Sequence, residues 1–290
     1  MADVVARGVR FNVTTMGHGE PPVVFVHGLP LDNLSSYYMT LAPAVSKANR
    51  AILYDLRGHG RSEQPRDGYT GDDMAADLEG IVDALGMTDR RVIVVGHSFG
   101  GYVALRFAER NADRVRGLAL LDAQSGVAEI GERIGASMAL QGEERVAKFK
   151  EVFGNWLAKH AARGHVDLDD LDLDALDADG RSTAQFAGRL ARRKRSPTVQ
   201  SALRLRDETT FVSDLAATTP IADAVLAGIG CPVLALYGEA SELRADGERL
   251  LRLMPRCKLT IVPGCAHGIL FHATAFVRAA LVEWLAEVSR

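Results

Sequence analysis

Short apolar runs alternate with helical patterns through the first half of the chain. The runs extend over Val23 to Gly28, Ala51 to Gly58, Val92 to Ser98, and Leu118 to Ala123. Because they are almost continuously apolar, they are typical of strands buried on both faces of a parallel sheet. Helical patterns between them cover residues 36–46, 71–85 and 101–112. The alternation therefore predicts an α/β fold in which helices cover the sheet.

Both ends of the chain are predicted to extend this sheet. Residues 4–17 read VVARGVRFNVTTMG, which indicates two antiparallel strands that turn at Gly8 and form an edge of the sheet. Pro232 to Gly238 and Lys258 to Gly264 predict two later strands, and an amphipathic pattern predicts a final helix over Ala273 to Val288.

The strand and helix alternation stops between about residues 124 and 215. This interruption predicts a helical lid, with a core domain built from residues 1–123 and 216–290. Within the lid, residues 143–162 have helical apolar spacing, whereas an acidic run over 167–180 and a basic run over 189–195 are typical of a solvated surface. We expect such a lid to close over a pocket at the carboxyl edge of the sheet.

Composition and charge narrow the function classes. The 290-residue chain is 47% hydrophobic, and its net charge of −3 does not favour nucleic acid or an anionic membrane as a partner. No basic leader and no apolar run long enough for a membrane span is visible, which favours a cytoplasmic protein. Three cysteines without metal-site spacing predict neither disulfides nor a metal, and no cofactor is expected.

The strongest chemical signal is the G-x-S-x-G motif of residues 96–100, GHSFG. It directly follows an apolar strand pattern and directly precedes a helical pattern. A serine on such a tight turn exposes its hydroxyl, and only small neighbours such as Gly96 and Gly100 fit the strained backbone. The motif therefore predicts that Ser98 is a nucleophile, with a helix N-terminus behind it where an oxyanion would form.

A second motif, HGLP at residues 27–30, follows the Val23 strand. A carbonyl attacked by Ser98 would become an oxyanion that needs two backbone donors at about 2.7–3.1 Å. We expect these donors to be the N–H groups of Leu29 and of Phe99, the residue after the nucleophile. His27 is interpreted as a structural residue of this loop.

Together these motifs resemble the α/β-hydrolase superfamily, in particular its lidded, esterase-like branch. The resemblance rests on HGLP, on DLRGHGRS at residues 55–62, on GHSFGG, and on GCAH at residues 264–267, and it covers nearly the whole chain. It implies an α/β-hydrolase fold, with an eight-stranded, mostly parallel sheet, flanking helices and a helical lid inserted after strand 6. It also implies a triad in the chain order nucleophile, acid, histidine.

The resemblance makes His267 the general base, because it lies late in the chain just after the last predicted strand. His272, which is expected to begin the last helix, and His59 are the competing histidines. Asp55 and Cys265 are interpreted as structural, with Arg57 or Arg61 as a partner for Asp55.

The acid departs from the family pattern, because Ser241 stands where an aspartate is usual after the seventh strand. Glu242, one residue later, is the preferred acid. Asp122, after the sixth strand, is the alternative, and either carboxylate would orient the imidazole.

These features predict a serine hydrolase that cleaves a carboxylic ester, lactone or thioester through an acyl-enzyme. The expected partner is a small, mostly hydrophobic acyl substrate. A serine nucleophile disfavours the aspartate-dependent epoxide hydrolases and haloalkane dehalogenases. Two alternatives stay open: a C–C hydrolase, lyase or cyclase that uses the same site, and a ligand-binding protein without catalysis. Oligomeric state is not predicted.

Overall fold

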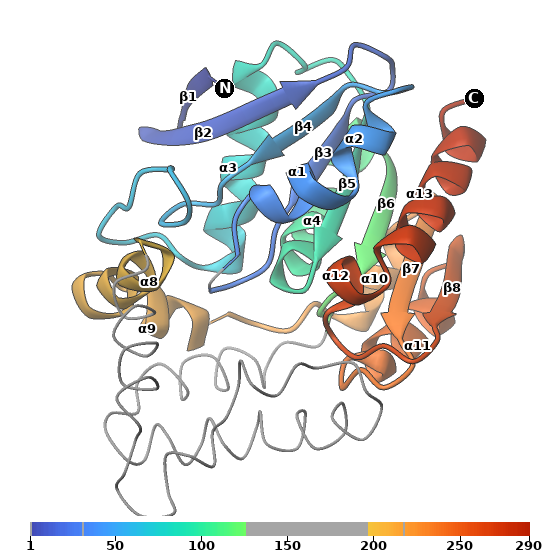
Figure 1. Ribbon diagram of the computed structural model, residues 1–290. Helices are drawn as coiled ribbons and strands as arrows, with labels where there is room; N and C mark the ends of the chain where they lie inside the picture. Colours follow the sequence, from blue (N-terminus) through green and yellow to red (C-terminus); the bar gives the residue numbers. More distant parts are fainter. Residues whose placement is uncertain (1, 31, 126–196, 217) are drawn as a thin grey trace, which may run out of the picture.

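The structure, a computed structural model, describes residues 2–30, 32–125, 197–216 and 218–290. Across these ranges the strands form one eight-stranded sheet in the order β1-β2-β4-β3-β5-β6-β7-β8 (Figure 1). The strands are β1 Ala2–Ala6, β2 Val9–Met16, β3 Val23–Val26, β4 Ala51–Tyr54, β5 Val92–His97, β6 Val115–Leu121, β7 Val233–Gly238 and β8 Cys257–Val262. Strands β3 to β8 are parallel, whereas β1 and β2 pair antiparallel at one edge. The predicted fold is therefore confirmed.

The central strands are apolar on both faces because each face packs against its own core. In β5, Val92 and Val94 belong to one hydrophobic cluster, while Ile93 and Val95 belong to the other. All four side chains are fully buried. Successive strand residues point to opposite faces, so a sheet covered on both sides needs the unbroken apolar runs seen in the sequence.

Helices cover both faces of the sheet (Figure 1). Helices α3, α4 and α11 supply buried residues to the first cluster, and α1, α2, α12 and α13 supply the second. The helices with described positions are α1 Ser35–Thr40, α2 Ala42–Val45, α3 Gly71–Ala84, α4 Phe99–Arg110, the 3₁₀ turn η1 Ala112–Arg114, α8 Pro197–Glu208, α9 Phe211–Ala216, α10 Asp223–Gly228, α11 Arg244–Leu253, α12 Ile269–His272 and α13 Thr274–Val288.

Two predicted helices differ from the structure. The pattern over residues 36–46 forms two helices, α1 and α2, because Pro43 has no N–H and its ring would clash with the preceding helical turn. The final helix begins at Thr274, and His272 is the last residue of the separate short helix α12. The expectation that His272 begins the last helix was therefore wrong.

The predicted lid is described only at its end, in α8 and α9. Leu205 and Phe211 are fully buried, and Phe211 packs edge-on against Tyr69 and His59. These helices therefore cover the loop that follows β4. The predicted helix over 143–162 and the charged runs over 167–180 and 189–195 lie outside the described residues, so the division into core and lid stays a prediction. A helix long and apolar enough to cross a membrane does not occur in the described ranges.

Candidate active site

Ser98 stands on a sharp turn between β5 and α4. Its backbone has φ 54° and ψ −124°, a region that non-glycine residues rarely adopt, so the turn is strained. A Cβ atom added to Gly96 would lie 2.4 Å from the carbonyl oxygen of Gly100. A Cβ atom added to Gly100 would lie 2.1 Å from the carbonyl oxygen of Val26. The two glycines therefore allow the close backbone contacts that hold this serine at the end of β5.

The hydroxyl of Ser98 belongs to a hydrogen-bonded chain of three side chains, Ser98, His267 and Asp122, which we call the relay. Its Oγ lies 3.0 Å from His267 Nε2, and His267 Nδ1 lies 2.7 Å from Asp122 Oδ2. Since a carboxylate accepts hydrogen bonds, Nδ1 carries the proton and Nε2 is free to accept from Ser98. The residues come from the ends of β5 and β6 and from the loop after β8, at the carboxyl edge of the sheet.

Asp122 is fully buried and firmly held. Besides the His267 imidazole, its carboxylate accepts the Gly238 N–H at 2.9 Å and the Ser241 hydroxyl at 2.6 Å. Its backbone φ of 44° is a second positive value at this edge. Three donors compensate for the loss of water around the buried charge and keep one oxygen directed at His267.

The two candidate acids of the sequence occupy different places. Asp122 is bonded to His267 Nδ1, and Ser98 occupies the other ring nitrogen, whereas Glu242 lies at an exposed position. Of the two candidates, the structure thus brings Asp122 to the imidazole. Ser241 turns inward to Asp122 and also accepts the Leu243 N–H at 3.0 Å, which leaves the next side chain on the outside of the turn.

The two expected oxyanion donors flank Ser98. Phe99 is the first residue of α4, so its N–H has no acceptor within the helix, and the Leu29 N–H likewise has no backbone acceptor among the described residues. The loop of Leu29 comes very close to the nucleophile: a Cβ added to Gly28 would lie 3.1 Å from Ser98 Cβ. Both N–H groups therefore belong to backbone segments that lie beside the serine, and their role as oxyanion donors stays a prediction.

His97, the residue before the serine, was not singled out from the sequence. Its ring stacks on that of His267, with centroids 5.0 Å apart and planes 26° from parallel, and its Nε2 lies 3.3 Å from the His267 carbonyl oxygen. Burial, with a smaller effect of His267, lowers the pKa of His97 to about 4. A neutral ring thus supports one face of the relay histidine. Its adjacency to Ser98 was the only signal in the sequence.

Gln124 was also missed. It is buried, its N–H donates to the Ser98 carbonyl at 3.2 Å, and its side-chain amide lies 3.5 Å from Ser98 Oγ. The oxygen of the same side chain is buried and has no hydrogen-bond partner among the described residues. Only Ala123 separates it from Asp122, so one short segment after β6 places an amide near Ser98 and a carboxylate on His267.

The remaining candidates support loops. His27 bonds to the Gly28 carbonyl and to the Leu56 N–H, at 2.7 and 3.0 Å. Asp55 accepts hydrogen bonds from Asn12 and from the backbone N–H groups of Leu34 and Arg61.

Arg57 does not bond to Asp55 but forms a buried ion pair with Asp77. Burial lowers the pKa of His59 to about 3, and Cys265 is buried with its thiol pKa raised by burial. Within the described ranges, no cluster of three or more histidine, cysteine or carboxylate residues is arranged to hold a metal ion.

Curated proteins with similar sequences are enzymes of several kinds. The chain is 37% identical over 135 residues to a soluble epoxide hydrolase of Corynebacterium sp. strain C12, covering 46% of this chain and 45% of that one. It is 39% identical over 122 residues to a 2-hydroxy-6-oxo-2,4-heptadienoate hydrolase of Pseudomonas putida, covering 41% and 43%. The chain thus matches less than half the length of each of these two relatives.

Solved structures are similar over nearly the full length. A meta-cleavage product hydrolase of Pseudomonas fluorescens IP01 (CumD) superposes with a TM-score of 0.71 at 22% identity, over 99% of this chain and 98% of that one. An esterase of Thermogutta terrifontis gives a TM-score of 0.70 at 22% identity, over 100% and 99%. A family model described as the alpha/beta hydrolase family matches residues 23–280. The sharp turn at Ser98, the sheet order and this match agree, and the chain belongs to the alpha/beta hydrolase family.

Proposed function

We propose that this chain is a serine hydrolase that cleaves carboxylic esters, lactones or thioesters through an acyl-enzyme. The observation that carries the proposal is the continuous relay from Ser98 Oγ through His267 to Asp122, with separations of 3.0 and 2.7 Å. We assign the acid to Asp122 and not to Glu242, because a carboxylate must touch the imidazole to hold its tautomer and stabilise the imidazolium.

In the first step His267 Nε2 takes the Ser98 proton while Oγ attacks the substrate carbonyl. The N–H groups of Leu29 and Phe99 stabilise the oxyanion that develops. Asp122 keeps the proton on Nδ1, so that Nε2 is the basic nitrogen, and it stabilises the imidazolium that forms. The proton then passes to the leaving alcohol or thiol, and the acyl group remains on Ser98.

In the second step a water molecule attacks the acyl-enzyme with His267 as its general base. The acid product leaves and Ser98 regains its proton. Every proton transfer uses the same imidazole nitrogen, which is why the geometry of His267 matters for both steps. His97 and Asp122 hold that ring from its face and from its far nitrogen.

Serine at position 98 favours acyl transfer over epoxide opening, the activity named for the Corynebacterium relative. The similarity to an esterase structure and to a hydrolase of a 2-hydroxy-6-oxo acid supports a small carboxylic substrate. Because of the similarity to the Pseudomonas putida hydrolase, C–C cleavage at Ser98 is the alternative reaction. A substrate panel of simple aryl esters, lactones and a 2-hydroxy-6-oxo dienoate, with product analysis, distinguishes the two reactions.

Covalent labelling by a fluorophosphonate probe tests the nucleophile. Wild type should be labelled, and Ser98→Ala and His267→Ala should lose labelling. Ser213→Ala, which removes an exposed serine hydroxyl on α9, is the control and should be labelled like wild type. Labelling of Ser98→Ala at the wild-type level would refute the assignment, and a wild type that binds substrates without turnover would support a ligand-binding protein instead.

A further inference from the structure

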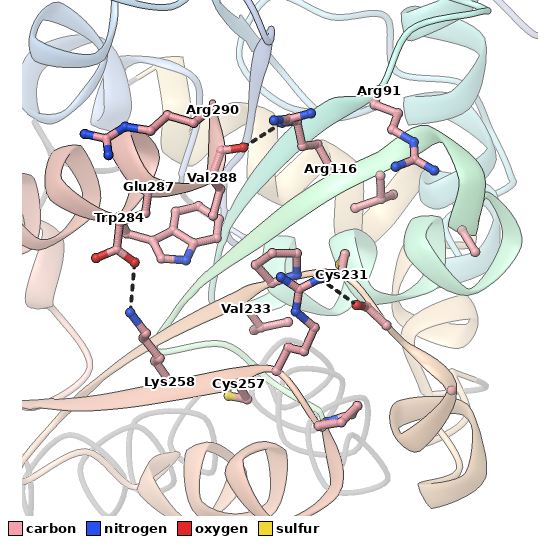
Figure 2. A pocket seen from close by; sticks show the side chains of 17 residues that line it. Arg91, Arg116, Cys231, Val233, Cys257, Lys258, Trp284, Glu287, Val288 and Arg290 are labelled. Carbon is pink, nitrogen blue, oxygen red and sulfur yellow. Dashed lines mark hydrogen bonds and ion pairs between the residues drawn. The ribbon is translucent and has the colours of Figure 1, made fainter.

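A large cavity, with lining side chains drawn in Figure 2, is formed where several strands of the sheet begin. Its volume is about 990 Å³, and its lining includes the first residues of β6, β7 and β8. Since these strands are parallel, their first residues lie at the amino edge, a strand length away from the relay. The charged side chains of this basic cavity are Arg91, Arg116, Arg256, Lys258, Arg290 and Glu287.

Five cationic side chains against one acidic side chain make this lining positive, although the whole chain has a net charge of −3. Lys258 pairs with Glu287 at 2.8 Å. No ion pair in the described part of the chain involves the four arginines. Elsewhere, arginines such as Arg114 and Arg249 do pair with carboxylates. Carboxylates of the described residues therefore do not neutralise the excess positive charge of the cavity.

The arginines are also held in place. Arg91 Nε donates to the Asp113 carbonyl at 2.9 Å, and Arg116 Nε donates to the Val288 carbonyl at 2.6 Å (Figure 2). Arg256 makes a longer contact of 3.5 Å with the Gly230 carbonyl. These bonds tie the guanidinium groups to the backbone through one nitrogen and leave their other N–H groups for a ligand. A guanidinium fixed in this way loses little side-chain entropy when it binds an anion.

The volume of the cavity and the positions of its cationic groups indicate the class of ligand. The volume falls within the range of small-molecule pockets, and the charge is gathered in one cavity, not spread along a surface as for nucleic acid. The guanidinium groups come from the starts of β5, β6 and β8, so an occupant needs several charged oxygens. Phosphoryl groups provide them and match the arginine fork. We propose that the basic cavity binds a small anion with two or more phosphoryl groups.

Titration calorimetry with sodium tripolyphosphate at low ionic strength tests the proposal. Wild type should bind, and its affinity should fall as salt is added because the contact is ionic. Arg116→Gln and Arg256→Gln should each weaken binding about tenfold, as expected for one lost charge-assisted hydrogen bond. Absence of binding in wild type, or equal affinity in wild type and in a variant that carries both Arg116→Gln and Arg256→Gln, would overturn the proposal.

Arg278→Gln is the matched control. Arg278 is an exposed arginine whose Nε donates to a backbone carbonyl, that of Thr40, but it does not line the basic cavity. It should bind tripolyphosphate like wild type. Near-ultraviolet circular dichroism of every variant shows that each is folded, so a loss of binding is read independently of any activity at Ser98.

Discussion

The two edges of the sheet hold charge in different ways. At the carboxyl edge Asp122 is fully buried and accepts three hydrogen bonds, one of them from His267. At the amino edge Arg91, Arg256 and Lys258 are exposed, and most of the cationic groups have no carboxylate partner among the described residues. A buried charge must be fixed by the protein itself, whereas an exposed one is solvated until a ligand replaces the water. Chemistry is therefore expected at the first edge and reversible binding at the second.

The largest expected effect on kcat comes from a substitution that removes the buried charge of Asp122. Asp122→Asn should lower kcat about 10³- to 10⁴-fold, because the amide stabilises the wrong imidazole tautomer and no imidazolium. Glu242→Gln, a change of the same kind on the exposed neighbour of Ser241, should alter kcat less than twofold. Steady-state kinetics on an aryl ester measure both variants, and the opposite ranking would return the acid to Glu242.

The second largest effect is expected from acidification, which should lower the free energy of unfolding through buried histidines near the carboxyl edge. The pKa values of His97 and His59 are lowered to about 4 and about 3, so the unfolded chain binds more protons than the folded one below pH 6.5. Stability should be unaffected by these groups above that pH and should fall by about 3 kcal/mol for each histidine at pH 4.

Urea unfolding at pH 7 and pH 4 measures this loss. His97→Gln and His59→Gln should each show a smaller loss between the two pH values than wild type, while His18→Gln, at an exposed position, should retain the wild-type difference. Equal acid sensitivity in all four proteins would contradict the role of the buried rings.

Ser241→Ala should have a smaller effect on the same edge. It removes one of three donors to Asp122 and leaves the carboxylate and His267 in place. We expect kcat to fall about tenfold with little change in KM, consistent with the loss of one hydrogen bond to a charged group. Ser241→Thr retains a hydroxyl and should recover part of the rate. A changed KM at constant kcat would indicate a substrate contact instead.

The smallest effect is expected at the amino edge. Arg116→Gln in the absence of polyphosphate should change kcat less than twofold, because the basic cavity and the relay lie at opposite ends of the strands. The same assay measures it. A tenfold decrease in kcat of a folded Arg116→Gln protein would show that the two edges are energetically coupled and would contradict their separate roles.

Much of the carboxyl edge was predictable because its signals are local. The motif at Ser98 is a contiguous one between a strand and a helix, and the alternation of apolar runs predicted a parallel sheet covered by helices, while the family resemblance implied its eight strands. Helix boundaries were less predictable: Pro43 divides one expected helix, and the final helix begins after His272. The predicted lid over residues 124–215 stays a prediction.

The sequence by itself determined the fold, the nucleophile candidate and its glycine neighbours, since each depends on residues adjacent along the chain. Only the tertiary structure showed that Asp122 contacts His267, because it brings together the segments after β6 and β8 although 145 positions separate the two residues. It also brought Arg91 and Arg256 to one cavity across 165 residues of sequence. Parallel strands align their like ends in space, and this alignment cannot be read from spacing along the chain.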